Sequence, residues 1–138
     1  MEGGVIISPT RPPNYEAIVA AFPVVKSKYG IIFTYGHVIH NPDGISVTPD
    51  LHAHEQTHTI QQTSFGMTPE RWWEQYINDV DFRLKQEVEA YRAQYNFVME
   101  NYGRDQRRAL LKHITKALSG SMYGRIVTVA GAKKLVTG

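Results

Sequence analysis

The chain contains no cysteine, which excludes disulfides and every metal site that depends on thiolate ligands. It also lacks an apolar run long enough to cross a bilayer, because the longest, Ala17 to Val25, is interrupted by Pro23. The first residues, Met1 to Gly4, have no basic segment of the kind that opens a signal peptide. With neither a signal peptide nor a transmembrane segment visible, the sequence predicts a cytoplasmic location by default.

An excess of one charge is also missing, because 15 basic and 13 acidic residues give a net charge of +2. The one basic cluster is typical of the solvated face of a helix; it consists of Arg104, Arg107, Arg108 and Lys112. Neither a nucleic acid nor a membrane is therefore expected as a partner. With 138 residues, 42% of them hydrophobic, the chain is expected to fold as a single domain over residues 1–138.

What the sequence does contain is an H-E-x-x-H motif, His54-Glu55-Gln56-Thr57-His58. On a helix, two histidines four residues apart lie on one face, where both imidazoles can bind one Zn²⁺ ion. Glu55 lies beside them and can accept a proton from a water molecule held at the metal. With 6 histidines in the chain, chance gives this pattern in roughly one or two shuffled sequences per hundred. The motif therefore needs the support of a helix and a third ligand.

The segment around the motif has the signals of a helix. Thr48, Pro49 and Asp50 resemble a helix start, and neither glycine nor proline follows as far as Thr63. Within this helix the two histidines and the glutamate of the motif project within about 60° of Leu51. They are expected to line a cleft. The alternative is that they are partly exposed helix residues without a ligand.

A second expected helix, residues 82 to 102, supplies the third ligand. Its apolar positions recur at helical spacing: Leu84, Val88, Tyr91, Tyr95, Val98 and Tyr102. Glu87 projects about 60° from the centre of this stripe, whereas Glu89 projects about 140° from it, toward solvent. A carboxylate at the margin of an apolar face is costly unless it is paired or bound to a metal, so Glu87 is the predicted ligand. The alternative is an ion pair between Glu87 and Arg83, one turn earlier.

With these residues the chain resembles the gluzincin group of metallopeptidases, and overall it looks similar to small gluzincin-like peptidases of bacteria and phages. In that group the H-E-x-x-H is followed by E-x-x-A-D or E-x-E-A-D on a second helix, and here the matching segment is Glu87-x-Glu89-Ala90. The resemblance covers roughly residues 31 to 95. It implies Zn²⁺ as the cofactor, Glu87 as the third ligand, and a peptide or protein as the substrate.

The chain departs from this group at one position. Many gluzincins have an aspartate four residues after the ligand glutamate, where it orients a zinc-bound histidine, and here that residue is Tyr91. Asp79 or Asp81 is a possible substitute for the missing carboxylate. Tyr91 belongs either to the apolar stripe or to the catalytic residues, where its hydroxyl would stabilise the oxyanion.

The expected fold class is α+β, a small zincin-like fold that is mainly helical, with a short β-hairpin before the H-E-x-x-H helix. Strands are predicted at 29–35, 38–40 and 45–47, with a hairpin turn at 41–44. The edge of this hairpin is expected to bind an extended peptide as an added strand.

Several polar and aromatic residues have two readings each. His37 and His40 are expected to be ordinary strand residues rather than ligands, and His113 is either a core or surface residue or a transition-state stabiliser. Gln61 and Gln62 are either exposed or hydrogen-bonded near the site. One tryptophan of the Trp72-Trp73 pair is expected in the core, and the other at the rim of the cleft.

The sequence therefore predicts a zinc-dependent hydrolase, specifically a metallopeptidase. In this interpretation His54, His58 and Glu87 hold Zn²⁺, and Glu55 and Tyr91 act in catalysis. One alternative is a non-catalytic zinc-binding structural or interaction domain, for example one associated with a virion or a toxin. Another is a helical interaction protein in which the histidines bind no metal. The sequence indicates neither the cleavage specificity nor the oligomeric state.

Overall fold

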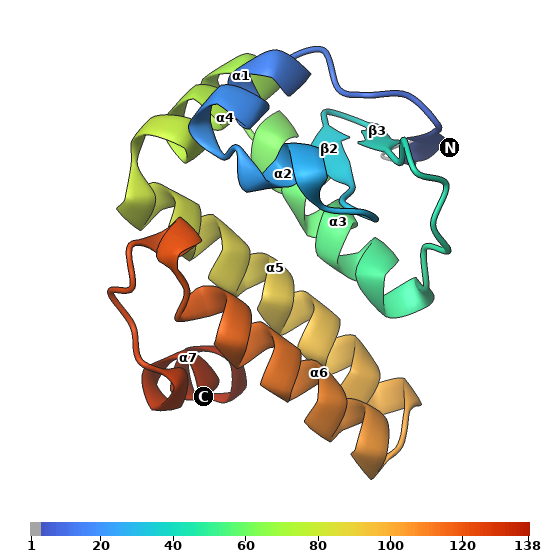
Figure 1. The fold of residues 1–138 in the computed structure, drawn as a ribbon. Helices are drawn as coiled ribbons and strands as arrows, with labels where there is room; N and C mark the ends of the chain where they lie inside the picture. Colours follow the sequence, from blue (N-terminus) through green and yellow to red (C-terminus); the bar gives the residue numbers. More distant parts are fainter. Residues whose placement is uncertain (1–3) are drawn as a thin grey trace.

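The computed structural model describes residues 4–138 and has the expected α+β fold, mainly helical with one small sheet (Figure 1). The elements in chain order are β1 (Ile6–Ser8), α1 (Tyr15–Ala21), α2 (Val24–Ser27), β2 (Phe33–Tyr35), β3 (Val38–His40), α3 (Pro49–Thr63), α4 (Pro69–Asn78), α5 (Val80–Asn101), α6 (Arg104–Leu118), the 3₁₀ turn η1 (Ser121–Tyr123) and α7 (Val129–Thr137). Within this part of the chain no helix is both long and apolar enough to cross a membrane.

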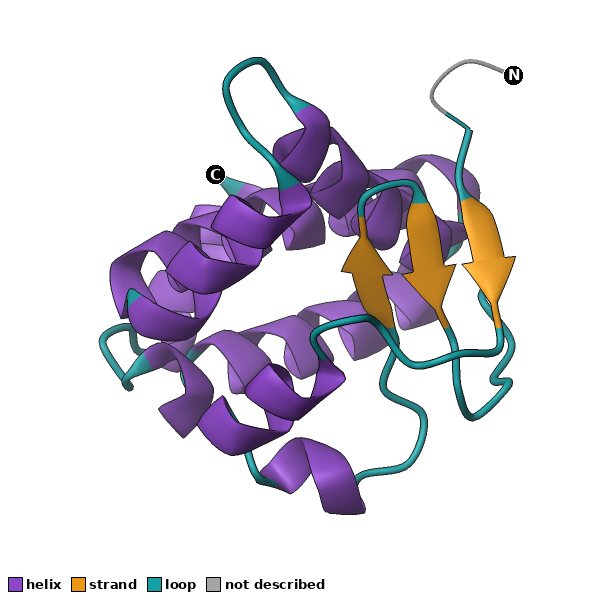
Figure 2. Cartoon of the chain, turned by 90° about the horizontal axis from the view of Figure 1, so that it is seen from above, coloured by secondary structure: helices purple, strands orange, loops and turns teal. Residues whose placement is uncertain are grey.

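The sheet has three strands in the order β1-β3-β2 and lies at one side of the helices (Figure 2). Strands β2 and β3 are antiparallel, and β1 pairs with β3 in parallel. The tight turn between β2 and β3 contains Gly36 in the left-handed region, at a φ of 63°. A residue without a Cβ adopts this conformation with little strain.

The hairpin predicted around residues 41–44 is wrong, because residues 45–47 form no strand. Both edges of β3 are occupied instead by β1 and β2. The turn itself is present, but a side chain closes it: Asn41 Nδ2 donates to the Ile45 carbonyl at 2.8 Å, and Asn41 Oδ1 accepts from Ile45 N–H at 3.0 Å. The local turn signal was correct, whereas the strand partners come from segments that are distant in the sequence.

Helices α3, α4 and α5 begin where the sequence provides a cap or a proline. Pro49 opens α3, and the Thr68 hydroxyl accepts from the N–H of Arg71 at the start of α4. The Asp79 carboxylate accepts from the N–H groups of Asp81 and Phe82, so α5 begins two residues earlier than the apolar stripe predicted. Such side-chain acceptors satisfy N–H groups that have no partner within the helix.

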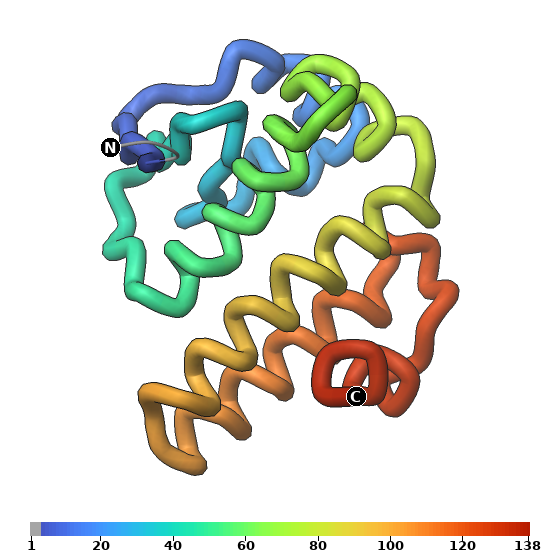
Figure 3. Tube along the Cα trace, turned by 180° about the vertical axis from the view of Figure 1, so that it is seen from behind, coloured from blue at the N-terminus to red at the C-terminus, as the bar shows by residue number. Residues whose placement is uncertain are grey.

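Helices α3 and α5 pack against each other and position the candidate site. Helix α3 also contacts β2, and α5 also packs against α6 and α7 (Figure 3). One apolar cluster is formed by residues of α1, α2, β2 and α4, and includes Ile18, Phe33, Trp72, Trp73 and Tyr76. A second lies between α5, α6 and α7, and includes Leu84, Ile114, Leu118, Ala132 and Val136. Each face of the α3–α5 pair is thus supported by its own core.

Candidate metal centre

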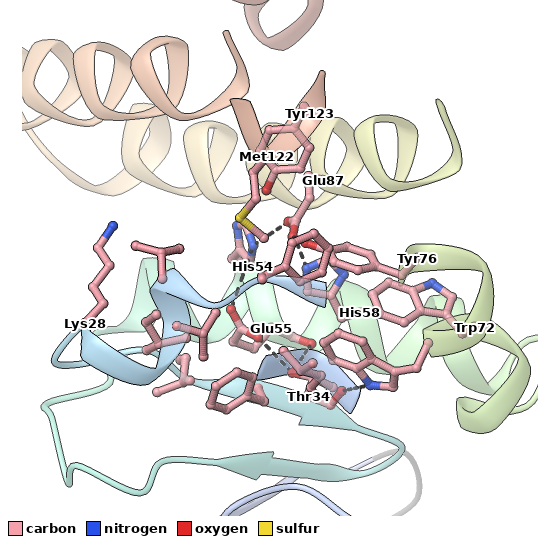
Figure 4. Close-up of a pocket in the computed structure, with 18 residues that line it drawn as sticks. Lys28, Thr34, His54, Glu55, His58, Trp72, Tyr76, Glu87, Met122 and Tyr123 are labelled. Carbon is pink, nitrogen blue, oxygen red and sulfur yellow. Dashed lines mark hydrogen bonds and ion pairs between the residues drawn. The ribbon is translucent and has the colours of Figure 1, made fainter. Parts of the chain in front are cut away.

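The three predicted metal ligands converge where α3 faces α5. One ligand atom from each of His54, His58 and Glu87 lies within 4.8 Å of the other two. Both histidines turn Nε2 toward the same oxygen, Glu87 Oε1, at 3.2 Å from His54 and 3.0 Å from His58 (Figure 4). Two imidazole nitrogens and one carboxylate oxygen fit Zn²⁺, which commonly binds such a set together with a water molecule.

These ligands are buried, with exposed fractions of 6% for His54, 5% for His58 and 9% for Glu87. Burial acts to lower the pKa of His58, but the negative charge of Glu87 and their hydrogen bond outweigh it and raise this pKa to about 9. Burial acts to raise the pKa of Glu87, but the charge of His58 and the hydrogen bonds from both histidines hold it well below its usual range. The electrostatics therefore favour a cation, a proton or a metal ion, between these side chains.

Tyr76 fixes the second oxygen of Glu87. Its hydroxyl donates to Glu87 Oε2 at 2.6 Å. Burial, the Glu87 charge and the neighbouring Tyr123 raise the pKa of Tyr76 well above 10.0, so the hydroxyl keeps its proton and remains a donor. The stacked ring of Trp72 holds Tyr76 in place, with ring centroids 5.0 Å apart. Glu87 is thereby arranged to offer a single oxygen, Oε1, to a metal.

Glu55 is the predicted general base, and it is buried beside the ligands. The hydroxyl of Thr34 on β2 donates to Glu55 Oε1 at 2.8 Å. The other oxygen, Oε2, lies 3.8 Å from His54 Nε2, on the side of the metal ligands. One oxygen of Glu55 is thus anchored, and the other is left on the side of the candidate ligands (Figure 4).

A cavity of about 180 Å³ opens onto these residues, and its lining includes the three ligands and Glu55. Much of the remaining wall is apolar, with Ile18, Phe22, Val25, Ile31 and Phe33 among its residues. Trp72 and Trp73 both line it and both are buried, so the expectation that they divide between core and rim is wrong. The metal ligands are thus accessible to a small group that enters past an apolar wall.

Side chains already form hydrogen bonds with the backbone of β2 where this strand lines the cavity. The carbonyl of Thr34 accepts from Gln62 Nε2 at 2.9 Å and from Trp73 Nε1 at 3.0 Å. Gln62 also accepts from the N–H of Gly36 at 2.7 Å, so it joins α3 to the turn of the hairpin. At Thr34 the strand edge is therefore not free to pair with an added peptide strand.

Tyr91 lies against the site but not in the cavity. Its ring packs edge-on against His54, with centroids 4.5 Å apart. Burial and the charges of Glu87 and Glu55 raise its pKa, so its hydroxyl stays protonated. Among the described residues, the tyrosines that line the cavity are Tyr76 and Tyr123. The catalytic role of Tyr91 stays a prediction.

The residues that the sequence offered as an ion-pair partner for Glu87, or as a carboxylate orienting a histidine, do not take these roles. Arg83 donates to the carbonyls of Tyr76, Ile77 and Met122, and Glu87, its alternative ion-pair partner, faces the histidines instead. Asp79 caps α5, so it does not orient a ligand histidine. Asp81 is exposed in the first turn of α5.

Three further histidines considered from the sequence also lie outside the cluster. His37 is exposed, and His40 is buried beside the hydroxyl of Thr10, 3.0 Å from Nδ1. His113 is exposed on α6, with its ring centroid 6.4 Å from that of Tyr91. None of the three is among the residues that line the cavity.

Sequence reasoning missed three residues that contact the site. Thr34 and Tyr76 approach from β2 and α4, and no local pattern connects them with the motif. Gln94, whose Oε1 lies 3.0 Å from His54 Nδ1, carried a signal: it follows Glu87 by two helical turns on the same face of α5. Gln61 and Gln62 were named, but the reading of them as exposed residues is wrong, since both are buried.

Comparison of the chain with protein-family models, with curated protein sequences and with solved structures found no match.

Proposed function

We propose that this protein is a zinc-dependent hydrolase, most specifically a gluzincin-type metallopeptidase that cleaves a peptide or protein substrate. The observation that supports it is the convergence of His54, His58 and Glu87 within 4.8 Å, with Glu55 beside them in one cavity. A buried carboxylate and two buried imidazoles that share one point are the donor set of a catalytic zinc site.

Zinc bound there would supply Lewis acidity, which lowers the pKa of a coordinated water toward ~7 and polarises a carbonyl group. Glu55 Oε2 faces this point, and it takes the proton of the attacking water and then gives it to the leaving amine. Thr34 holds the other oxygen and keeps the carboxylate in this orientation. Tyr91 is proposed to donate to the oxyanion, since its hydroxyl keeps its proton.

The first test is metal content. The protein is purified without chelator, dialysed against Zn²⁺ and analysed for metal, and about one zinc per chain is expected because three ligands and one water complete the site. A protein that takes up no zinc would contradict the proposal and favour an interaction protein in which the histidines bind no metal.

The second test is Glu55→Gln, compared with the unmodified protein on a peptide library at equal zinc occupancy. Glutamine keeps the shape and still hydrogen-bonds, but it cannot take a proton, so the rate should fall on the order of 10²–10⁴-fold while zinc is retained. Equal cleavage by both proteins would exclude Glu55 as the base. Zinc binding without any cleavage would favour a non-catalytic zinc-binding structural or interaction domain.

A further inference from the structure

The outer nitrogen of each ligand histidine contacts a glutamine. His54 Nδ1 lies 3.0 Å from Gln94 Oε1, and His58 Nδ1 lies 2.8 Å from Gln61 Oε1. Both glutamines are buried, with exposed fractions of 6% and 9% for Gln94 and Gln61. The aspartate that gluzincins use for such an orienting contact is replaced here by Tyr91, which packs on His54 through its ring.

The orientation of the Gln94 amide is fixed from behind. Its Nε2 donates to Asp50 Oδ2 at 2.8 Å, and Asp50 lies in the first turn of α3. A carboxylate oxygen only accepts, so the NH₂ end of the amide must face Asp50 and the oxygen must face His54. The contact with His54 is then a hydrogen bond only if Nδ1 carries the proton.

The Gln61 amide is fixed in the same way by two acceptors. Its Nε2 donates to the carbonyl of Gln86 at 3.0 Å and to Glu89 Oε1 at 2.7 Å. The oxygen of Gln61 therefore faces His58 Nδ1, which must also carry a proton. The two chains of contacts have the same order: imidazole, amide, carboxylate.

On the basis of the proposed metal site, we propose that Gln94 and Gln61 are positioning residues that hold both histidines in the Nδ1–H form, backed by Asp50 and Glu89. With the proton held at Nδ1, Nε2 of each ring faces Glu87 Oε1, and a metal ion that displaces the proton shared there would take the Nε2 lone pair. This form needs no rearrangement of either ring when a metal ion enters.

These imidazole–amide–carboxylate contacts, called the relay below, also change the charge around the site. A carboxylate that contacts a ligand imidazole directly makes it a stronger donor. Here each carboxylate lies one amide further away, and Glu89 is exposed to solvent. Of the acidic side chains in residues 4–138, Glu87 and Glu55 are the two that lie within 3.8 Å of a ligand nitrogen. A metal at this site should therefore keep more of its positive charge than one surrounded by orienting carboxylates.

The first experiment measures the tautomers directly. Side-chain ¹H–¹⁵N spectra of the ¹⁵N-labelled protein, saturated with Zn²⁺, show which nitrogen of each histidine carries the proton. We expect His54 and His58 to be protonated at Nδ1 and bound through Nε2. Protonation at Nε2 in either histidine would overturn the proposal while leaving the metal site itself intact.

The second experiment measures zinc affinity by competition with a chelator. Gln94→Met and Gln61→Met remove the acceptor while keeping the length of the side chain, and each should weaken zinc binding by about 10–100-fold. The matched control is Gln56→Met, because Gln56 is an exposed glutamine on the same helix as Gln61. Unchanged affinity in both of the first two variants would overturn the proposal.

A polarity-reversed pair separates positioning from simple packing. Gln94→Glu combined with Asp50→Asn places a carboxylate acceptor at His54 Nδ1 and an amide donor behind it, so the bond to His54 keeps its direction and the bond between positions 94 and 50 is restored with donor and acceptor exchanged. The pair should bind zinc at least 10-fold more tightly than Gln94→Met. Affinity no better than that of Gln94→Met would count against the relay. If the unmodified protein bound no zinc, the proposed function would fail instead.

Discussion

At the scale of single residues, two neighbouring glutamates on α5 have opposite surroundings. Glu87 is buried and faces both histidines, whereas Glu89 is exposed and reaches the site only through Gln61. Helical phase explains the difference, since residues two apart project about 200° from one another. Orientation rather than residue type thus decides which of the two glutamates is the candidate third ligand.

This difference gives the first prediction. Glu87→Ala should abolish tight zinc binding, because it removes the carboxylate that both histidines contact. Glu89→Ala should weaken zinc binding by less than about 10-fold, because only the support of one amide is lost. Zinc titrations of the two variants side by side make the comparison. The reverse order of effects would mean that Glu89 is the ligand.

Thr34 provides a second prediction, for the general base. Thr34→Val removes the hydroxyl that donates to Glu55 Oε1 and keeps the branched shape, so hydrolysis should fall about 10-fold with zinc content unchanged. Thr34→Ser is the control, because it keeps the hydroxyl and should retain most of the activity. A rate for Thr34→Val equal to that of Thr34→Ser would show that this hydrogen bond does not orient the base.

At the scale of elements, the site is the place where α3 and α5 cross. The local signals of both helices were readable in the sequence: Pro49 at the start of α3, and an apolar stripe along α5 that placed Glu87 near its buried side. How the two helices cross could not be predicted from local patterns. The crossing determines which residue of one helix faces which residue of the other. Contacts such as Gln94 with His54 therefore appear only in the structure.

The sheet illustrates the same limit. Strands β2 and β3 are separated by a turn of two residues, yet the stronger turn signal at Asn41-Pro42-Asp43-Gly44 pointed to the wrong hairpin. A strand of three residues carries little periodicity, and the parallel pairing of β1 with β3 joins segments that are far apart in sequence. Local patterns predicted the fold class and the three side chains that converge as candidate ligands, while tertiary pairing decided the sheet and the residues that contact this cluster.

A substitution at Ala90 can test how closely α3 and α5 must pack. It is completely buried on α5, one turn after Glu87. Ala90→Leu should push α5 away from its neighbours, lower the stability by ~1–3 kcal/mol and weaken zinc binding. Ala109→Leu on α6 is the control, because Ala109 is exposed. Thermal unfolding and a zinc titration are the measurements; an unchanged affinity would show that the ligand positions tolerate a wider spacing.

At the scale of the whole molecule, the candidate metal site lies between two apolar clusters that share few residues. The ligand histidines lie on α3, next to the cluster that contains Trp72, whereas Glu87 lies on α5, which carries Leu84 of the other cluster. A cation bound to side chains from both helices would hold the two parts together. Its binding free energy then becomes folding free energy, since an unfolded chain has no such site.

Protons and zinc should therefore compete in their effect on stability. The pKa of His58 is raised from 6.5 to about 9 in the folded protein, so the stabilisation from its proton is complete below pH 6.5 and is lost as the pH rises through 9. With a chelator present, the melting temperature should fall over this interval. Zinc replaces the proton at Nε2, so the increase in melting temperature that zinc causes should grow from pH 6.5 to 9.

Melting curves at several pH values, with chelator and with excess Zn²⁺, measure this difference. His113→Gln should show the same growth of the zinc effect with pH. His113 lies outside the cluster, so the substitution removes only an exposed imidazole. His58→Gln should abolish it, since both the competing proton and one ligand are lost. If the zinc effect in the unmodified protein did not change between pH 6.5 and 9, zinc and the proton would not share His58. The metal would then have to bind elsewhere in the molecule.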